Sequence, residues 1–245
     1  MDPVLYVVDG GVATVTLNRP HARNAIDTPL AAGLAEALER AETDDDVHVV
    51  LFTGADPAFC AGLDLKEFTR TRRPPPRSSD AILGVAELSK PTIGAINGPV
   101  MTGGLEFALG LDVLVASERA TFADTHASVG ILPGGGMTAR LPRAVGRRLA
   151  MDMSYTGRVL TAAEALAAGL VSRVVQHEEL LGTVTAMATG IAQRQPRVMR
   201  ELKQLYRVSR DVTLAESLAH EVAERDRRRA AGAALVPGTD RARFT

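Results

Sequence analysis

Two apolar strands in this sequence each lead, through a glycine-containing turn, into a helix. The first strand, Val47–Thr53, is nearly all apolar, which is typical of a strand buried on both faces of a sheet. The second, Thr92–Ile96, is followed by a predicted helix over Gly103–Gly110 that begins with two glycines. Strands that alternate with helices in this way predict an α/β fold rather than an all-helical or all-β one.

The rest of the chain extends this alternation and then becomes helical. The Asp9-Gly10-Gly11 turn between two β-rich runs predicts a hairpin over 4–17. An apolar stripe at helical spacing predicts a helix over Thr28–Glu42, with Thr28 as its N-cap. Further strands are predicted over 112–116 and 171–175, and further helices over 134–141, over 161–169 and throughout 178–231. We therefore expect a mixed α/β core over residues 1–190 and a helical C-terminal region over 191–245.

Composition and charge exclude several classes of partner. The chain has 28 Lys and Arg residues against 29 Asp and Glu residues, so a net charge of −1 gives no electrostatic case for binding nucleic acid or an anionic membrane. The single Cys60 excludes an intramolecular disulfide, and the five histidines show no metal-ligand spacing. The N-terminal MDPVLYVVDGG does not resemble a signal peptide, and no apolar run is long enough to span a membrane. We expect a cytoplasmic protein without metal, membrane or nucleic-acid partners.

Two turns between a strand and a helix carry candidate chemistry. Segment Phe59–Leu65 would expose free backbone N–H groups beside a helix start, or it is an ordinary loop in which Asp64 caps the helix. In the second turn, Gly103 and Glu106 are three residues apart, so a backbone donor and a carboxylate share one helix face. The apolar neighbours of Glu106 indicate that it is buried, where an unpaired carboxylate is costly and usually functional. The alternative is a glutamate that only stabilises the helix dipole.

Three other segments give weaker signals. Gly134, Gly136 and Ala139 match G-x-G-x-x-A, but a proline precedes them and the strand before them is weak, so a dinucleotide fingerprint is disfavoured. Cys60 has apolar neighbours and is expected to be a buried thiol rather than a nucleophile. The basic, proline-rich stretch Arg70–Ser79 is either a phosphate-attracting lid or a solvated loop.

Five motifs follow one another along the chain. They are NRP at 18–20 with NAI at 24–26, FCAGLDL at 59–65, AING at 95–98 with GGLE at 103–106, GILPGGG at 130–136, and TG at 156–157 with GLV at 169–171. In this order and spacing they resemble the motifs of the enoyl-CoA hydratase/isomerase (crotonase) family. The resemblance covers roughly residues 4–230.

The resemblance implies a fold, an assembly and a substrate class. The fold would be a crotonase-like spiral of ββα units over 1–190, with a helical oligomerisation region over 191–245 and a homotrimer or homohexamer as the assembly. The substrate would be an acyl-CoA thioester, whose enolate is stabilised by an oxyanion hole made of the backbone N–H groups of Leu63 and Gly103. No cofactor is implied beyond the coenzyme A of the substrate.

The resemblance also implies where the substrate lies. Coenzyme A would be bound mostly through backbone groups of Arg23, Ala25, Ala61, Asp64, Leu65 and Gly104. Three apolar side chains are candidates to line the acyl pocket, or are simply core: Leu83, Met101 and Met137.

The sequence departs from the family at one catalytic position. Family hydratases use two glutamates; Glu106 matches the first, and His126 stands at the second, with Asp124 two residues before it as a possible substitute. Imidazole titrates near neutral pH, so His126 either replaces the missing carboxylate in proton transfer or only fills space beside the pocket.

The function predicted from these residues is that of a lyase which adds water to a trans-2-enoyl-CoA, with Glu106 and His126 as the catalytic residues. Two alternatives stay open because the second glutamate is missing. One is an enoyl-CoA isomerase or another enolate-forming acyl-CoA enzyme, and the other is an acyl-CoA-binding protein with little catalysis.

Overall fold

The computed structural model of the chain describes residues 2–232. It divides into two compact units, the first ending at Met199 and the second beginning at Arg200. The predicted C-terminal region 191–245 therefore overlaps the end of the first unit, and its last residues, 233–245, lie outside the described residues. No helix within residues 2–232 is both long enough and apolar enough to cross a membrane.

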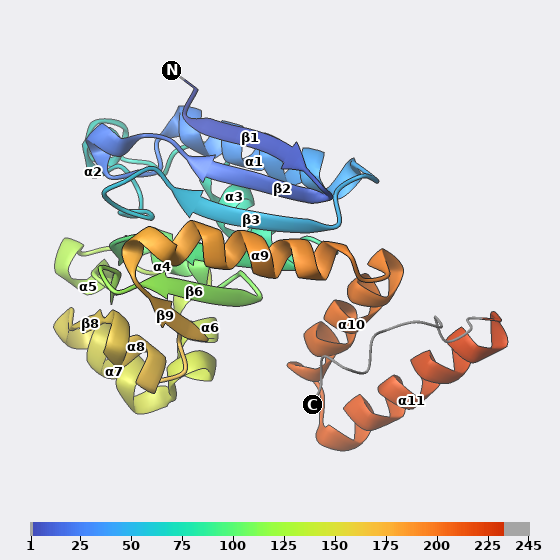
Figure 1. The fold of residues 1–245 in the computed structure, drawn as a ribbon. Coiled ribbons are helices and arrows are strands. Elements are labelled where there is room, and N and C mark those ends of the chain that lie inside the picture. The colour runs from blue at the N-terminus through green and yellow to red at the C-terminus, as the bar shows by residue number, and fades with distance from the viewer. Residues whose placement is uncertain (1, 233–245) are drawn as a thin grey trace. The chain divides into compact units, whose positions relative to one another are not determined.

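Two sheets make up the β structure of the first unit (Figure 1). The larger sheet has the order β1-β2-β3-β4-β6-β9, and the smaller has the order β5-β7-β8. The larger sheet contains β1 (Val4–Asp9), β2 (Val12–Leu17), β3 (Val49–Gly54), β4 (Thr92–Ile96), β6 (Val113–Ser117) and β9 (Arg173–Val175). The smaller contains β5 (Val100–Met101), β7 (Thr121–Ala123) and β8 (Val159–Thr161). The predicted hairpin is confirmed, since β1 and β2 pair antiparallel with Asp9 opposite Val12.

In each ββα unit, the chain forms one strand of the larger sheet, then one strand of the smaller sheet, and then a helix. Parallel strands β4 and β6 lie side by side in the larger sheet, and each continues into a strand of the smaller sheet, β5 or β7. A helix then follows in each case, α4 (Gly103–Ala108) after β5 and α5 (His126–Val129) after β7. The turn after β3 repeats the pattern in reduced form, because Cys60 forms a parallel bridge with Val100 of β5. The predicted spiral of ββα units is therefore confirmed.

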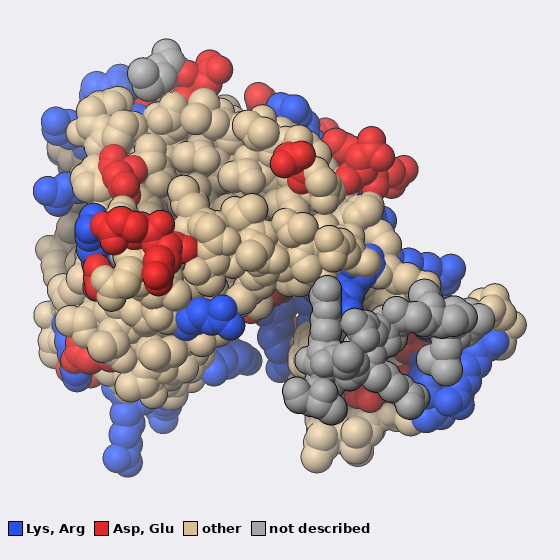
Figure 2. Space-filling model, viewed as in Figure 1, with Lys and Arg blue, Asp and Glu red and all other residues tan. Residues whose placement is uncertain are grey.

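Two helices cover opposite parts of this core. Helix α1 (Thr28–Thr43) buries the apolar stripe recognised in the sequence, but its N-cap is Asp27 rather than the predicted Thr28. Asp27 has extended backbone angles and its carboxylate accepts the amide hydrogen of Leu30, which is the geometry that an N-cap requires. Helix α9 (Leu180–Ala192) lies against β3 and β4 and contains no charged residue, so Figure 2 shows an uncharged band over it.

The remaining helices of the first unit connect the strands. They are α2 (Leu65–Thr71), α3 (Ser78–Gly84), α6 (Met137–Val145), α7 (Arg147–Thr156) and α8 (Ala162–Ala167), with short 3₁₀ turns at Pro20–Ala22, Val85–Glu87 and His177–Glu179. Helix α8 begins with a capping box, in which Thr161 and Glu164 bond reciprocally. The helix predicted over 134–141 begins later, at Met137, because Gly134–Gly136 form a loop.

The second unit is helical over its described residues. It contains most of α10 (Pro196–Ser209) and all of α11 (Leu214–Ala230). Helix α11 opens with a capping box between Thr213 and Glu216, and an ion pair of 2.5 Å between Arg228 and Glu201 joins it to α10. Large apolar side chains of both helices are exposed, among them Leu202, Tyr206, Leu214, Leu218 and Val222.

Candidate active site

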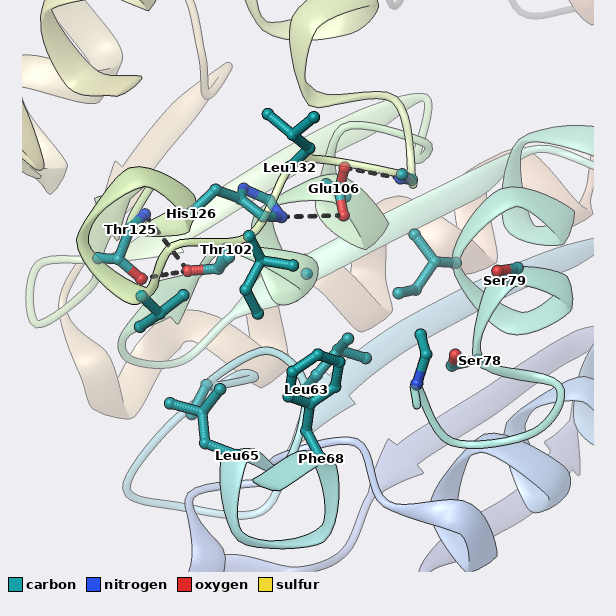
Figure 3. Close-up of a pocket in the computed structure, with 18 residues that line it drawn as sticks. Leu63, Leu65, Phe68, Ser78, Ser79, Thr102, Glu106, Thr125, His126 and Leu132 are labelled. Carbon is teal, nitrogen blue, oxygen red and sulfur yellow. Dashed lines mark hydrogen bonds and ion pairs between the residues drawn. The ribbon is translucent and has the colours of Figure 1, made fainter. Parts of the chain in front are cut away.

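A cavity of about 150 Å³ opens in the first unit between the turns that follow β3, β5 and β7. Thr102 and Glu106 from one turn and Thr125 and His126 from another face one another in it, and Leu63, Leu65 and Phe68 lie across from them (Figure 3). The polar residues are Ser78, Ser79, Thr102, Glu106, Thr125 and His126, and the apolar ones include Leu63, Leu65, Phe68, Ile82, Val129 and Ile131.

Glu106 is held with one carboxylate oxygen free. It lies on α4, is 3% exposed, and its Oε1 accepts the backbone N–H groups of Gly135 at 2.7 Å and Met137 at 3.2 Å. The backbone at Gly135 lies so close to the Glu106 carboxylate that no side chain fits there, since a Cβ atom on Gly135 would lie 2.7 Å from Oε2 of Glu106. The predicted burial of Glu106 is confirmed, and its Oε2 faces the imidazole of His126 within the cavity.

His126 faces Glu106 across the cavity, as Figure 3 shows. Its Nε2 lies 3.8 Å from Oε2 of Glu106, which is longer than a hydrogen bond, so both atoms remain available to a bound molecule. Its Nδ1 lies 2.6 Å from Oδ1 of Asp124, and its backbone N–H donates to the same oxygen at 3.1 Å. The structure therefore brings the predicted pair together within one cavity.

Asp124 supports the histidine and does not enter the cavity. Its second oxygen accepts a hydrogen bond of 2.6 Å from the hydroxyl of Ser154 on α7. Burial raises the pKa of Asp124, but the hydrogen bonds from His126 and Ser154 outweigh it, so the pKa is lowered overall. Asp124 is thus an ionised partner of His126 rather than a substitute for the missing glutamate.

The two predicted oxyanion-hole amides approach each other at the turns before α2 and α4. A Cβ atom built on Gly103 would lie 3.5 Å from the amide nitrogen of Leu63, and one built on Gly62 would lie 3.2 Å from that of Gly103. Within residues 2–232 neither amide donates a hydrogen bond to the protein. Two neighbouring free donors beside an acid/base pair can stabilise an oxyanion.

Thr102 fixes the turn that presents Gly103. Its φ of 51° and ψ of −111° are unusual for a β-branched residue. The turn is held by its backbone N–H, which donates to the Ala123 carbonyl at 2.9 Å, and by a 2.5 Å hydrogen bond between the hydroxyls of Thr102 and Thr125. Neither threonine was among the residues predicted from the sequence, because no motif distinguishes them from other turn residues.

The residues predicted to bind coenzyme A differ in their positions. Ala61 and Leu65 line the cavity, whereas Arg23, Ala25, Asp64 and Gly104 do not.

The residues outside the cavity make other contacts. Arg23 is exposed, and Asp64 caps α2 and forms an ion pair of 3.2 Å with Arg19. Burial raises the pKa of Asp64, but the hydrogen bonds from the Glu67 amide and Arg19 lower it overall. Gly104 packs against the chain, since a Cβ atom there would lie 2.3 Å from the Cys60 carbonyl oxygen. Contact of these residues with coenzyme A remains a prediction.

The three candidate acyl-pocket side chains do not line this cavity. Met137 is fully buried in the hydrophobic core, Met101 is half-buried in β5, and Leu83 is exposed on α3. Phe68 and Ile82 occupy the apolar wall instead. The lining was mispredicted because α2 and α3 approach the cavity through tertiary packing, which local apolar patterns do not reveal.

Cys60 is a buried thiol, as predicted. Its side chain is fully buried, and burial raises its pKa to about 12, so it is not a nucleophile at neutral pH. No group of three or more His, Cys, Asp or Glu residues able to hold a metal ion occurs in the described part of the chain.

A spiral of ββα units with paired free amides beside a buried acid/base pair defines a crotonase-fold enzyme. The sequence matches the enoyl-CoA hydratase/isomerase family over residues 8–227, and the chain belongs to this family.

Known relatives and solved structures agree with this family. The chain is 38% identical to a probable mitochondrial enoyl-CoA hydratase of Dictyostelium discoideum, over 86% of this chain and 78% of that protein. It is also 38% identical to the (E)-benzylidenesuccinyl-CoA hydratase of Thauera aromatica, over 89% and 87% of the two chains. The crystal structure of an enoyl-CoA hydratase from Mycobacterium avium is 48% identical, with a TM-score of 0.78, and the match covers 94% of this chain and 99% of that one.

Proposed function

We propose that this protein hydrates a trans-2-enoyl-CoA to the 3-hydroxyacyl-CoA. The observation that carries the proposal is the pair of facing groups in the cavity, Glu106 Oε2 and His126 Nε2, 3.8 Å apart and beside two free backbone amides. Hydration needs a base for water, an acid for carbon and a donor pair for the enolate oxygen. This cavity contains a candidate for each, and the relatives that share the family are named as hydratases.

The proposed reaction divides these roles among three groups. The thioester carbonyl oxygen accepts the N–H groups of Leu63 and Gly103. Glu106 removes a proton from water while the water oxygen bonds to C3, and the C2–C3 double-bond electrons move toward the carbonyl to form the enolate. The imidazolium of His126 then gives its Nε2 proton to C2, which restores the carbonyl. The proton that Glu106 took from water then passes to solvent, and His126 takes up a proton from solvent before the next turnover.

The alternatives predicted from the sequence make different demands on the same residues. An isomerase moves one proton between C2 and C4 and needs one carrier, whereas both Glu106 and His126 line this cavity. A protein that only binds acyl-CoA needs no facing acid and base. The presence of the pair therefore favours hydration.

An absorbance assay tests the proposal. Purified protein is incubated with crotonyl-CoA, and loss of the enoyl-thioester absorbance is followed together with formation of 3-hydroxybutyryl-CoA. We expect both. Binding without turnover would instead indicate an acyl-CoA-binding protein, and absence of binding to crotonyl-CoA and longer enoyl-CoAs would contradict the substrate class.

Gly62→Ala is expected to lower kcat by about 10² to 10³-fold, the effect of losing one oxyanion donor. Gly62 has a φ of +89°, and an added Cβ would lie 2.9 Å from the Met101 carbonyl oxygen and 3.2 Å from the Gly103 nitrogen, so the two donors must separate. Gly10→Ala is the matched control, because Gly10 has a φ of +54° with nothing within 4 Å. Both variants incur backbone strain, and equal kcat values for them in a steady-state assay would contradict this assignment.

We also propose a homotrimer or homohexamer. The support is the set of exposed apolar side chains on α10 and α11, which a partner subunit would cover. We expect a sedimentation mass near three or six times the 25.9 kDa of the chain. A mass near that of a single chain at micromolar concentration would contradict it.

Location and cofactor use remain predictions. The sequence predicts a cytoplasmic location, whereas the Dictyostelium relative is named as mitochondrial. The proposed steps use only protein groups, water and the thioester, so they require no cofactor beyond the coenzyme A of the substrate.

A further inference from the structure

His126 is held from two sides by groups that do not reach the cavity. Oδ1 of Asp124 accepts both the backbone N–H of His126 and a ring hydrogen bond from Nδ1, at 3.1 and 2.6 Å. Oδ2 of Asp124 accepts the Ser154 hydroxyl at 2.6 Å. The carboxylate is therefore fixed at both oxygens, by α5 on one side and by α7 on the other.

This arrangement determines which ring nitrogen exchanges protons. A carboxylate that is an ionised acceptor requires a proton on Nδ1, and the hydrogen bond at one ring nitrogen sets the state of the other. Only Nε2 is then left to face the cavity. The ionisable groups that face the imidazole among the described residues are Asp124 at Nδ1 and Glu106 at Nε2, while α7 contributes the hydroxyl of Ser154.

We infer that Asp124 and Ser154 are positioning residues that keep a proton on Nδ1 of His126 and so make Nε2 the atom that gives a proton to the substrate. This inference rests on the proposed hydration. The negative charge of Asp124 stabilises the imidazolium before proton transfer, and Nδ1–H persists after it. Ser154 acts indirectly, because its hydrogen bond to Oδ2 of Asp124 orients the carboxylate so that Oδ1 can accept the hydrogen bond from Nδ1.

A purely structural role for this cluster makes a different prediction. If Asp124 and Ser154 only joined α5 to α7, their replacement would change stability without changing the ring tautomer or the pH dependence of turnover. A spectroscopic reading of the ring and a pH profile therefore separate the two roles.

The ring state is read by ¹⁵N NMR of histidine-labelled protein without substrate, with His126→Asn used to assign the signals. At a pH where the ring is neutral, we expect Nδ1–H in the parent and a shift toward Nε2–H in Asp124→Ala. A neutral parent ring with its proton on Nε2, or an unchanged ring in Asp124→Ala, would overturn the inference. This reading needs no turnover, so it decides the inference even if the parent fails to hydrate crotonyl-CoA, a result that would refute the proposed function separately.

Kinetics of a shape-conserving variant provide the second reading. Asp124→Asn is expected to lower kcat about 10- to 100-fold with KM changed less than about threefold, the range for losing a hydrogen bond to a charged group. Its kcat–pH profile should differ from the parent profile, because the imidazolium that donates to C2 has lost the negative charge that stabilises it.

Ser154 is tested in the same assay. Ser154→Ala is expected to lower kcat by about three- to tenfold, the effect of one hydrogen bond, and Ser154→Thr should restore most of it. The control is Asp152→Asn, on the same helix but paired with exposed Arg158. A profile of Asp124→Asn that superimposes on the parent profile, or a loss in Asp152→Asn as large as that in Asp124→Asn, would overturn the inference.

Discussion

Glu106→Gln is expected to lower kcat for the hydration of crotonyl-CoA by about 10³-fold and to leave the Kd for a CoA thioester within about threefold of the parent value. Glutamine keeps an Oε1 that accepts the amides of Gly135 and Met137, so the side chain stays in place. What it loses is the basic oxygen that faces the cavity. The oxyanion donors are backbone groups and do not change, which is why binding is retained.

Steady-state kinetics and calorimetric binding of a non-reacting CoA thioester measure the two quantities separately. Glu118→Gln, an exposed change of the same kind, is the control and should have the parent kcat. Equal losses of turnover and of affinity in Glu106→Gln would show that Glu106 has a structural role only.

His126→Asn is expected to lower kcat by about 10²- to 10³-fold, because it removes the acid that protonates C2. The amide nitrogen of asparagine can still donate to the Asp124 carboxylate, which is 1% exposed and would otherwise be left without its ring partner. The variant thus removes Nε2 from the cavity and keeps the supporting hydrogen bond.

The pH dependence of kcat measures the same residue independently. The parent profile should have a limb that is absent in His126→Asn, while the exposed control His21→Asn keeps it. An unchanged rate and profile in His126→Asn would make His126 a bystander. His126→Glu is expected to be poorly active, since a carboxylate there stands beside both Asp124 and Glu106; a strong gain of hydration would mean that the parent is not a dedicated hydratase.

The sequence predicted the parts of this site that lie within single motifs. Gly103 and Glu106 are three residues apart on one helix, so their common face follows from helix geometry alone. The apolar neighbours of Glu106 predicted its burial, which the structure confirms. The pairing of Leu63 with Gly103 was implied by the resemblance to the family and not by the residues alone, and the structure brings their turns close together.

The parts that could not be predicted depend on contacts between distant segments. Ser154 reaches Asp124 from thirty residues further along the chain, and it belongs to none of the motifs recognised in the sequence. The amides of Gly135 and Met137 bind Glu106 only because the loop 134–136 is not helical, whereas the glycine pattern predicts a helix that begins at Gly134. The same dependence on packing explains why Met137 was a candidate for the acyl pocket but belongs to the core.

Incorporation of ¹⁸O from labelled water into the product of crotonyl-CoA, followed by mass spectrometry, shows whether the cavity adds water to the substrate. The proposed reaction places one water oxygen on C3, so we expect a 3-hydroxybutyryl-CoA that carries a single ¹⁸O in its hydroxyl group, formed by the parent and about 10³-fold more slowly by Glu106→Gln. Crotonyl-CoA that is bound but recovered unlabelled, or converted to an isomer without ¹⁸O, would contradict the claim that this cavity adds water to an enoyl thioester.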